Sequence, residues 1–163
     1  MRRTFKVLVL CTGNSARSIL GEMLFKHLGQ GRIEAYSAGS QPGGVVNPVA
    51  LETLQKHGVP CEGARSKSWN EFAAPDVPEF DFIFTVCGNA ANETCPVWPG
   101  HPVTAHWGIP DPAHVEPLAA RREAFEEAYQ SLTQRIEAFL ALPLETMAPQ
   151  ESALAARRIH IGE

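Results

Sequence analysis

A cysteine near the start of the chain opens a stretch whose residue types fit the binding of a tetrahedral oxyanion. Cys11 is followed by Arg17 and Ser18 in a C-x5-R-S pattern. A loop wrapped around an anion offers successive backbone N–H groups, and a helix beginning behind it adds the positive end of its dipole. The planar guanidinium of Arg17 can grip two anion oxygens. The same positive field favours thiolate over thiol, so Cys11 is a candidate nucleophile.

The rest of the loop is expected to cradle the same anion. Gly13 permits backbone conformations that other residues resist, Asn14 can brace the loop, and Ser18 can donate to the thiolate. A lone cysteine at the end of a strand is more often a small buried apolar residue. The spacing, the glycine, the preceding strand and the following helix together favour the nucleophile. The predicted oxyanion-binding residues are Thr12, Gly13, Asn14, Ser15, Ala16, Arg17 and Ser18.

The elements that must position this loop alternate along the chain. The predicted strands are Val7–Leu10, Ile33–Ala38, Phe80–Val86 and Val103–Trp107, and the predicted helices are Ile19–Leu28 with Gly29 as C-cap, Asn47 to Gly58, a short helix behind Ser68 with Glu71 in a capping box, and Pro117–Ala141. This alternation predicts an α/β fold with three α/β/α layers and a central four-stranded parallel sheet. Ligands of such folds bind beyond the carboxyl ends of the strands. We therefore expect Cys11, Cys87 and the loop containing Asp111 along one edge.

The size and charge of the chain exclude several classes of partner. With 163 residues and a net charge of −4, it fits one globular unit and does not present the basic surface of a nucleic-acid or anionic-membrane binder. No apolar run is long enough to span a membrane. We expect a catalytic domain over residues 1–142. The weakly patterned residues 143–163 form either a flexible tail or a short appended helix, and the pattern does not decide between them.

The four cysteines indicate thiol chemistry rather than structural disulfides or metal binding. The Val7–Leu10 run is too short for a signal peptide, so a cytoplasmic, reducing compartment is expected. There is no C-x-x-C pair, so neither a thioredoxin-type motif nor a zinc ribbon is present, and no metal site is predicted. Cys61 follows Pro60 and is interpreted as a half-buried structural thiol.

The loop resembles a known family. The stretch Val9–Ser18 is similar to the phosphate loop of low-molecular-weight protein tyrosine phosphatases, and more closely to that of the arsenate reductases built on the same fold. The likeness covers roughly residues 5–140. It continues at Tyr36-Ser37-Ala38-Gly39, Val46-Asn47-Pro48, Thr85-Val86-Cys87, Cys95-Pro96, His106-Trp107-Gly108 and Asp111-Pro112.

The resemblance implies a reaction and a role for each matching residue. Asp111 would be the general acid, and Cys11 would attack arsenate, with phosphate or sulfate as oxyanion mimics. Cys87 would then attack the Cys11 sulfur, and Cys95 would take over the resulting disulfide by thiol–disulfide exchange. The implied partner is an external reductant, either thioredoxin or glutathione with glutaredoxin. No tightly bound cofactor is implied.

The sequence departs in three ways from the thioredoxin-coupled members of this branch. The Cys87–Cys95 spacing is one residue longer, which leaves the reductant open, and Ala16 replaces an extra cysteine. Lys67 lies where some members have an aspartate that helps to bind potassium, whereas Asn14, Glu22 and Ser37 match the other ligands. A lysine there would place its charge where the ion would lie, so no potassium requirement is predicted.

Two alternatives to the reductase remain open. The first is a phosphatase acting through Cys11, Arg17 and Asp111, in which Cys87 and Cys95 would be idle. The second is a non-catalytic module that binds zinc or arsenite. Its ligands would be Cys87, Cys95, His101 and His106, although their spacing does not fit the usual zinc patterns.

Overall fold

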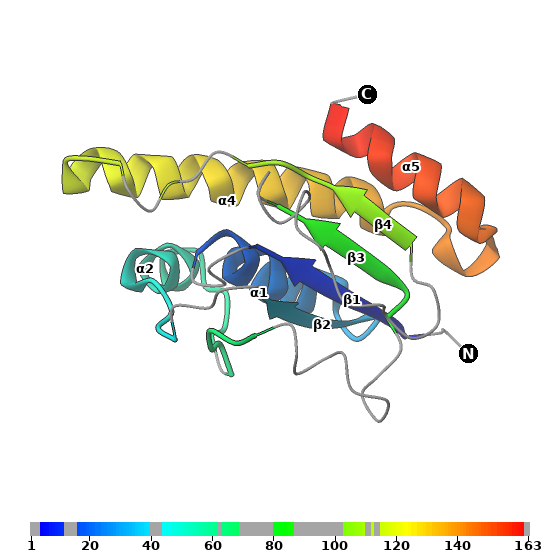
Figure 1. The fold of residues 1–163 in the computed structure, drawn as a ribbon, viewed down its shortest axis with the longest axis horizontal. Helices are drawn as coiled ribbons and strands as arrows, with labels where there is room; N and C mark the ends of the chain where they lie inside the picture. Colours follow the sequence, from blue (N-terminus) through cyan, green and yellow to red (C-terminus); the bar gives the residue numbers. More distant parts are fainter. Residues whose placement is uncertain are drawn as a thin grey trace.

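The computed structural model describes residues 4–11, 16–39, 44–61, 63–68, 80–86, 103–109, 112 and 115–161. The elements run in the order β1 (Phe5–Leu10), α1 (Arg17–Gly29), β2 (Ile33–Ala38), α2 (Pro48–Lys56), β3 (Phe82–Thr85), β4 (Val103–His106), α4 (Leu118–Leu140), the 3-10 helix η2 (Leu144–Thr146) and α5 (Pro149–Ile161) (Figure 1). The helix expected behind Ser68 lies outside the described residues.

The strands form one parallel sheet in the order β2-β1-β3-β4, so the predicted four-stranded parallel sheet is confirmed. Leu10 at the end of β1 pairs with Ala38 of β2 and with Thr85 of β3, and Thr85 pairs with His106 of β4. The carboxyl ends of the strands therefore lie in one row. β3 and β4 are shorter than predicted, since regular pairing ends at Thr85 and His106 and only single backbone hydrogen bonds, from Val86 and Trp107, continue beyond it.

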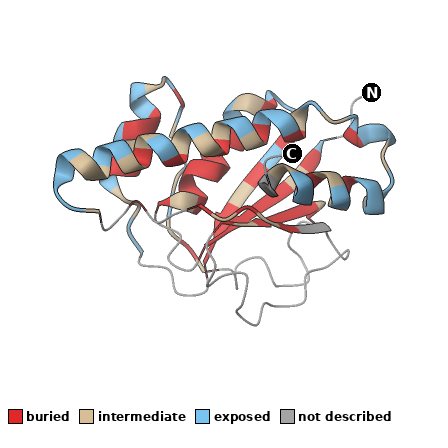
Figure 2. Cartoon of the chain, turned by 90° about the horizontal axis from the view of Figure 1, so that it is seen from above, coloured by how far each residue is buried: buried red, intermediate tan, exposed pale blue. Residues whose placement is uncertain are grey.

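Both faces of the sheet are buried. Val7 and Val9 belong to the larger core cluster, which they share with residues of α1 and α4, whereas Leu8 and Leu10 belong to a second cluster with Ile83. Successive side chains of a strand point to opposite faces, so a strand buried on both sides needs an apolar residue at every position. Both faces of the sheet are buried (Figure 2), as expected for the middle layer of the predicted α/β/α fold.

Aromatic rings tie the helices to the sheet around Trp107, which is fully buried. Its ring centroid lies 4.1 Å from that of Phe84 in β3, 6.1 Å from that of Phe25 in α1 and 6.0 Å from that of Phe139 in α4. Each such pair contributes about 0.5–1.5 kcal/mol beyond the burial of its surface. Trp107, the residue that follows β4, is thus fixed at the centre of the core by ring contacts.

The end of α1 differs from the prediction by one residue. Gly29 is still helical, and Gln30 takes the left-handed conformation of the C-cap with a φ of 45°. A glycine is required at position 29 by packing, since a Cβ there would lie 2.8 Å from the Ile33 side chain. The next predicted helix begins as expected, because the Asn47 side chain accepts a 2.9 Å hydrogen bond from the backbone N–H of Val49.

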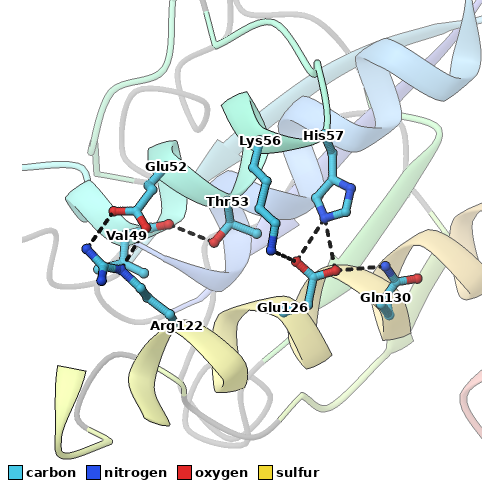
Figure 3. A network of polar contacts seen from close by, with 8 residues as sticks. All are labelled: Val49, Glu52, Thr53, Lys56, His57, Arg122, Glu126 and Gln130. Carbon is cyan, nitrogen blue, oxygen red and sulfur yellow. Dashed lines mark hydrogen bonds and ion pairs between the residues drawn. The ribbon is translucent and has the colours of Figure 1, made fainter. Parts of the chain in front are cut away.

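Polar side chains join α2 to α4 (Figure 3). His57 Nε2 lies 2.8 and 2.9 Å from the carboxylate oxygens of Glu126, and its ring stacks on Tyr129 with the centroids 4.0 Å apart. A second pair, Arg122 Nε to Glu52 Oε1 at 2.8 Å, is more exposed. Lys56 Nζ also lies 3.6 Å from Glu126 Oε1, so polar pairs of different burial bridge the same two helices.

Residues near the C-terminus form a packed helix rather than an extended tail. In Figure 1, α5 (orange to red) lies beside β4, and its contacts are with β4 and α4. Its inward face is formed by Ser152 and Ala156, both buried, and by Ile159, which packs partly buried against the core. The division of the chain at residue 142 stays a prediction.

Candidate active site

Cys11 lies one residue beyond β1, at the carboxyl edge of the sheet. The residue is 6% exposed, and its backbone N–H donates to the Ala38 carbonyl at 3.2 Å. The chain is described again from Ala16, which precedes the first turn of α1. Four of the predicted oxyanion-binding residues, Thr12, Gly13, Asn14 and Ser15, lie outside the described residues. The predicted strand before them and the predicted helix after them are both present.

Arg17 is the first residue of α1, and Ser18 beside it is fully buried. The positive end of the α1 dipole therefore lies at the end of the loop that starts with Cys11. Arg17 Nη1 donates a 2.8 Å hydrogen bond to the carbonyl of Ile109. This bond links the arginine of the anion loop to the segment after β4, on the path to Asp111.

The backbone brings the segments that carry Cys11, Cys87 and Asp111 together. The N–H of Val86 donates to the Leu10 carbonyl, and the N–H of Ile109 donates to the Val86 carbonyl, each at 3.0 Å. The residue before Cys87 is thus bonded directly to the residue before Cys11. Cys87, Cys95 and Asp111 themselves lie outside the described residues.

The segment Trp107–Ile109 is held by contacts that the sequence did not predict. Arg135 of α4 donates from Nη1 to the Gly108 carbonyl at 3.1 Å, and burial lowers the pKa of its guanidinium. Trp107 donates from Nε1 to the carbonyl of Ala156 in α5 at 2.8 Å. Both acceptors are backbone carbonyls, which leave no pattern in the sequence by which these contacts could be found.

A cavity of about 290 Å³ separates part of the same segment from α4. Ile109, Pro112 and Val115 line one side, and Ala124 and Ala128 of α4 are among the residues on the other. Ile109 and Pro112 are themselves buried, so both packing and hydrogen bonds position this stretch.

A buried charge cluster lies between α1 and β2, where the sequence analysis placed Lys67. Lys67 Nζ lies 3.6 Å from Glu22 Oε1 and donates to Ser37 Oγ at 3.4 Å and to the Arg65 carbonyl at 3.0 Å. Ser37 donates to the same carboxylate of Glu22. The lysine ammonium thus contacts two residues that match potassium ligands. The absence of a potassium requirement stays a prediction.

The remaining thiol and histidine have structural contacts. Cys61 is partly buried, burial raises the pKa of its thiol, and its Sγ lies 3.5 Å from the Val59 carbonyl oxygen. His106 Nδ1 hydrogen-bonds to Thr85 Oγ1 at 2.8 Å. In the part of the chain that the structure describes, no three His, Cys, Asp or Glu residues gather to hold a metal ion. Over the same residues, no helix is long and apolar enough to cross a membrane.

Comparison with known proteins gives one consistent family. Residues 6–152 match the family of the low molecular weight phosphotyrosine protein phosphatases. An arsenate reductase of Shouchella clausii (strain KSM-K16) is 35% identical over 132 residues, which cover 80% of this chain and 91% of that protein. An arsenate reductase of Bacillus licheniformis is 35% identical over 133 residues, which cover 80% of this chain and 91% of that protein.

Comparison with solved structures also gives arsenate reductases. The structure described as an arsenate reductase in the oxidized state has a TM-score of 0.68 at 27% identity, and the match covers 86% of this chain and 98% of that one. An arsenate reductase in the phosphate-binding state has a TM-score of 0.64 at 25% identity, covering 85% of this chain and 98% of that one.

Proposed function

Because this chain belongs to the low-molecular-weight phosphotyrosine protein phosphatase family, and its curated relatives are arsenate reductases, we propose that it reduces arsenate to arsenite by a relay of its own thiols. By homology it is an oxidoreductase of the arsenate reductase type. The observation that supports the relay is the hydrogen bond between Val86 and Leu10, since these two residues immediately precede Cys87 and Cys11.

The first step forms a bond between sulfur and arsenic. The Cys11 thiolate attacks arsenate, which the loop N–H groups and the Arg17 guanidinium hold, as oxyanion sites generally do. Asp111 gives its proton to the departing oxygen, which leaves as water. A structural relative in a phosphate-binding state supports a tetrahedral oxyanion as the ligand of this loop.

The second step transfers the electrons. The Cys87 thiolate attacks the Cys11 sulfur, the sulfur–arsenic bond breaks, and its electron pair stays on arsenic, which leaves as arsenite. A Cys11–Cys87 disulfide remains. Cys95 then attacks Cys87, Cys11 returns as a thiolate, and the Cys87–Cys95 disulfide is reduced by an external dithiol or by glutathione. We infer a reducing, cytoplasmic compartment, because the cycle needs that external reductant.

Phosphatase activity is the second candidate, because the family that matches residues 6–152 is named for it. A Cys11 phosphoenzyme would use the same Arg17 and Asp111 and would need no further thiol. The metal- or arsenite-binding module has less support: His106, the one described member of its ligand set, hydrogen-bonds to Thr85.

The test is arsenate-dependent oxidation of NADPH, measured separately with thioredoxin and thioredoxin reductase and with glutathione and glutaredoxin. We expect turnover by the wild type, loss of turnover in Cys11→Ser and Cys87→Ser, and loss of multiple turnover in Cys95→Ser. The productive couple identifies the reductant. No arsenate turnover in either system, with hydrolysis of an aryl phosphate that Cys11→Ser abolishes, would establish the phosphatase instead.

A further inference from the structure

The helix α5 contacts the chain at the base of the segment that leads to Asp111. Most of α5 lies beyond residue 152, where the match to the family ends. Its most buried positions carry the small residues Ser152 and Ala156, and Ala156 is fully buried. These small side chains let the helix backbone approach the sheet closely enough for a main-chain carbonyl to meet a core side chain.

That side chain is Trp107. Its indole Nε1 donates to the Ala156 carbonyl at 2.8 Å, its backbone N–H donates to the Thr85 carbonyl at 2.7 Å, and its ring packs against Phe84. A buried indole N–H that loses its acceptor costs free energy, so docking of α5 stabilises the tryptophan in this position. Trp107 precedes Asp111 by four residues.

The two residues after Trp107 are fixed from other helices. The Gly108 carbonyl accepts from Arg135 of α4, and the Ile109 carbonyl accepts from Arg17 of α1. From Ile109 on, a cavity that Pro112 and Val115 also line lies between this stretch and part of α4. Two donated side-chain hydrogen bonds, from α4 and α1, and the Ala156 carbonyl of α5, which accepts from Trp107, thus hold residues 107–109, which precede Asp111.

We propose that α5 is a positioning element for the general acid: by holding Trp107, it fixes the segment that delivers Asp111 to the leaving oxygen. This rests on the proposed function insofar as both take Asp111 as the acid. A small displacement of a catalytic group costs a large factor in rate, up to about 100-fold for 1 Å. We therefore expect loss of the contact with α5 to act on proton transfer, and KM reports any change that reaches Arg17 through its bond to Ile109.

The test uses the full-length chain and aryl phosphates whose leaving groups differ in basicity. Phenolate must be protonated as it leaves, whereas 2,4-dinitrophenolate leaves without a proton. We expect Trp107→Phe, which removes the Nε1 donor and keeps an aromatic ring, to lower kcat for phenyl phosphate about tenfold. For 2,4-dinitrophenyl phosphate we expect a change of less than about twofold, with KM unchanged for both substrates.

A double-substitution cycle decides whether the effect passes through Asp111. In an Asp111→Asn background, Trp107→Phe is expected to change the rate by less than about twofold, because the group it positions is gone. Losses that multiply, or equal losses for both leaving groups, would overturn the proposal. The rates in this double-substitution cycle can be measured with arsenate as well as with phenyl phosphate as the substrate.

Matched variants separate positioning from general damage to the core. Ala156→Leu keeps the carbonyl but enlarges the buried contact, and it should reproduce the leaving-group dependence of Trp107→Phe. Phe5→Leu removes a buried ring at the other end of β1, and Leu154→Ala alters an exposed side chain of α5; both should keep the wild-type ratio of the two substrates. A wild type that hydrolyses aryl phosphates but reduces no arsenate would refute the reductase and still decide the role of α5.

Discussion

Two lysines contact the carboxylate of Glu22 from different environments. The Lys67 ammonium is 3.6 Å from Oε1 with its side chain 5% exposed, whereas the Lys26 ammonium is 3.4 Å from Oε2 with its side chain 45% exposed. Removing the buried partner leaves a buried charge poorly compensated, so Lys67→Met is expected to lower the free energy of unfolding by about 3 kcal/mol. Lys26→Met is expected to cost less than about 1 kcal/mol. Urea unfolding measures both, and equal losses would show that burial does not set the strength of these pairs.

The position of the Lys67 ammonium also leads to a prediction about potassium binding. A potassium ion among Glu22 and Ser37 would have to displace a charge that is covalently part of the chain. We therefore expect the wild-type Tm and turnover to be the same in potassium chloride and in sodium chloride of equal ionic strength. A rise of either quantity specific to potassium contradicts this.

Among single residues, the sequence predicted best those whose partners are close in the chain. Cys11 and Arg17 were recognisable because a strand, a loop and a helix follow one another within a few residues. The role of Arg135 could not be predicted, because a charged residue in the long helix α4 is normally exposed to solvent. Its acceptor is the backbone carbonyl of Gly108. The side chain and its target share no local pattern.

The junction between the helices α2 and α4 should respond to pH. Burial opposes ionisation of the Glu126 carboxyl, but hydrogen bonds from Gln130 and His57 and the charge of Lys56 outweigh it and lower its pKa below the ordinary 4.5. A folded-state pKa below the unfolded one stabilises the fold above the unfolded pKa and is lost as the pH falls through the folded value. The loss of unfolding free energy in Glu126→Gln should therefore be fully present above about pH 5 and shrink toward zero as the pH falls below about 4.

The second pair between the same helices is the control. Glu52 and Arg122 are about half exposed, so Glu52→Gln is expected to change stability by less than about 1 kcal/mol. Denaturant unfolding of both variants across the pH range makes the comparison. A Glu126→Gln loss that is constant with pH would contradict the role of the ionised carboxylate.

At the level of elements, the sequence predicted the order and nearly the bounds of the main strands and helices. β2 matches Ile33–Ala38 as predicted, because an apolar segment between a helix end and a turn has few alternatives. α4 begins and ends one residue inside the prediction, since its buried residues Phe125, Leu132, Ile136 and Phe139 follow helical spacing. α5 could not be decided, because the small residues on its buried face give little apolar periodicity.

At the scale of the whole molecule, the contacts that complete the site join distant parts of the chain. Arg17 and Ile109 are 92 residues apart, and Trp107 and Ala156 are 49 apart. Sequence periodicity reports local structure, so it predicted that the strand ends share an edge but not which helices hold the segment after β4. Those contacts depend on how the helices pack on the finished sheet.

The bond between Trp107 and Ala156 also makes one hydrogen atom a reporter of the C-terminal helix. The indole N–H is fully buried and reaches solvent only when α5 lifts off or the whole molecule unfolds. Because the inward face of α5 is narrow, lifting should cost less than unfolding. In deuterated water, the indole resonance that Trp107→Phe removes from the NMR spectrum should therefore disappear before that of the Val9 amide in the central strand β1. Equal rates would mean that α5 and the sheet open only together.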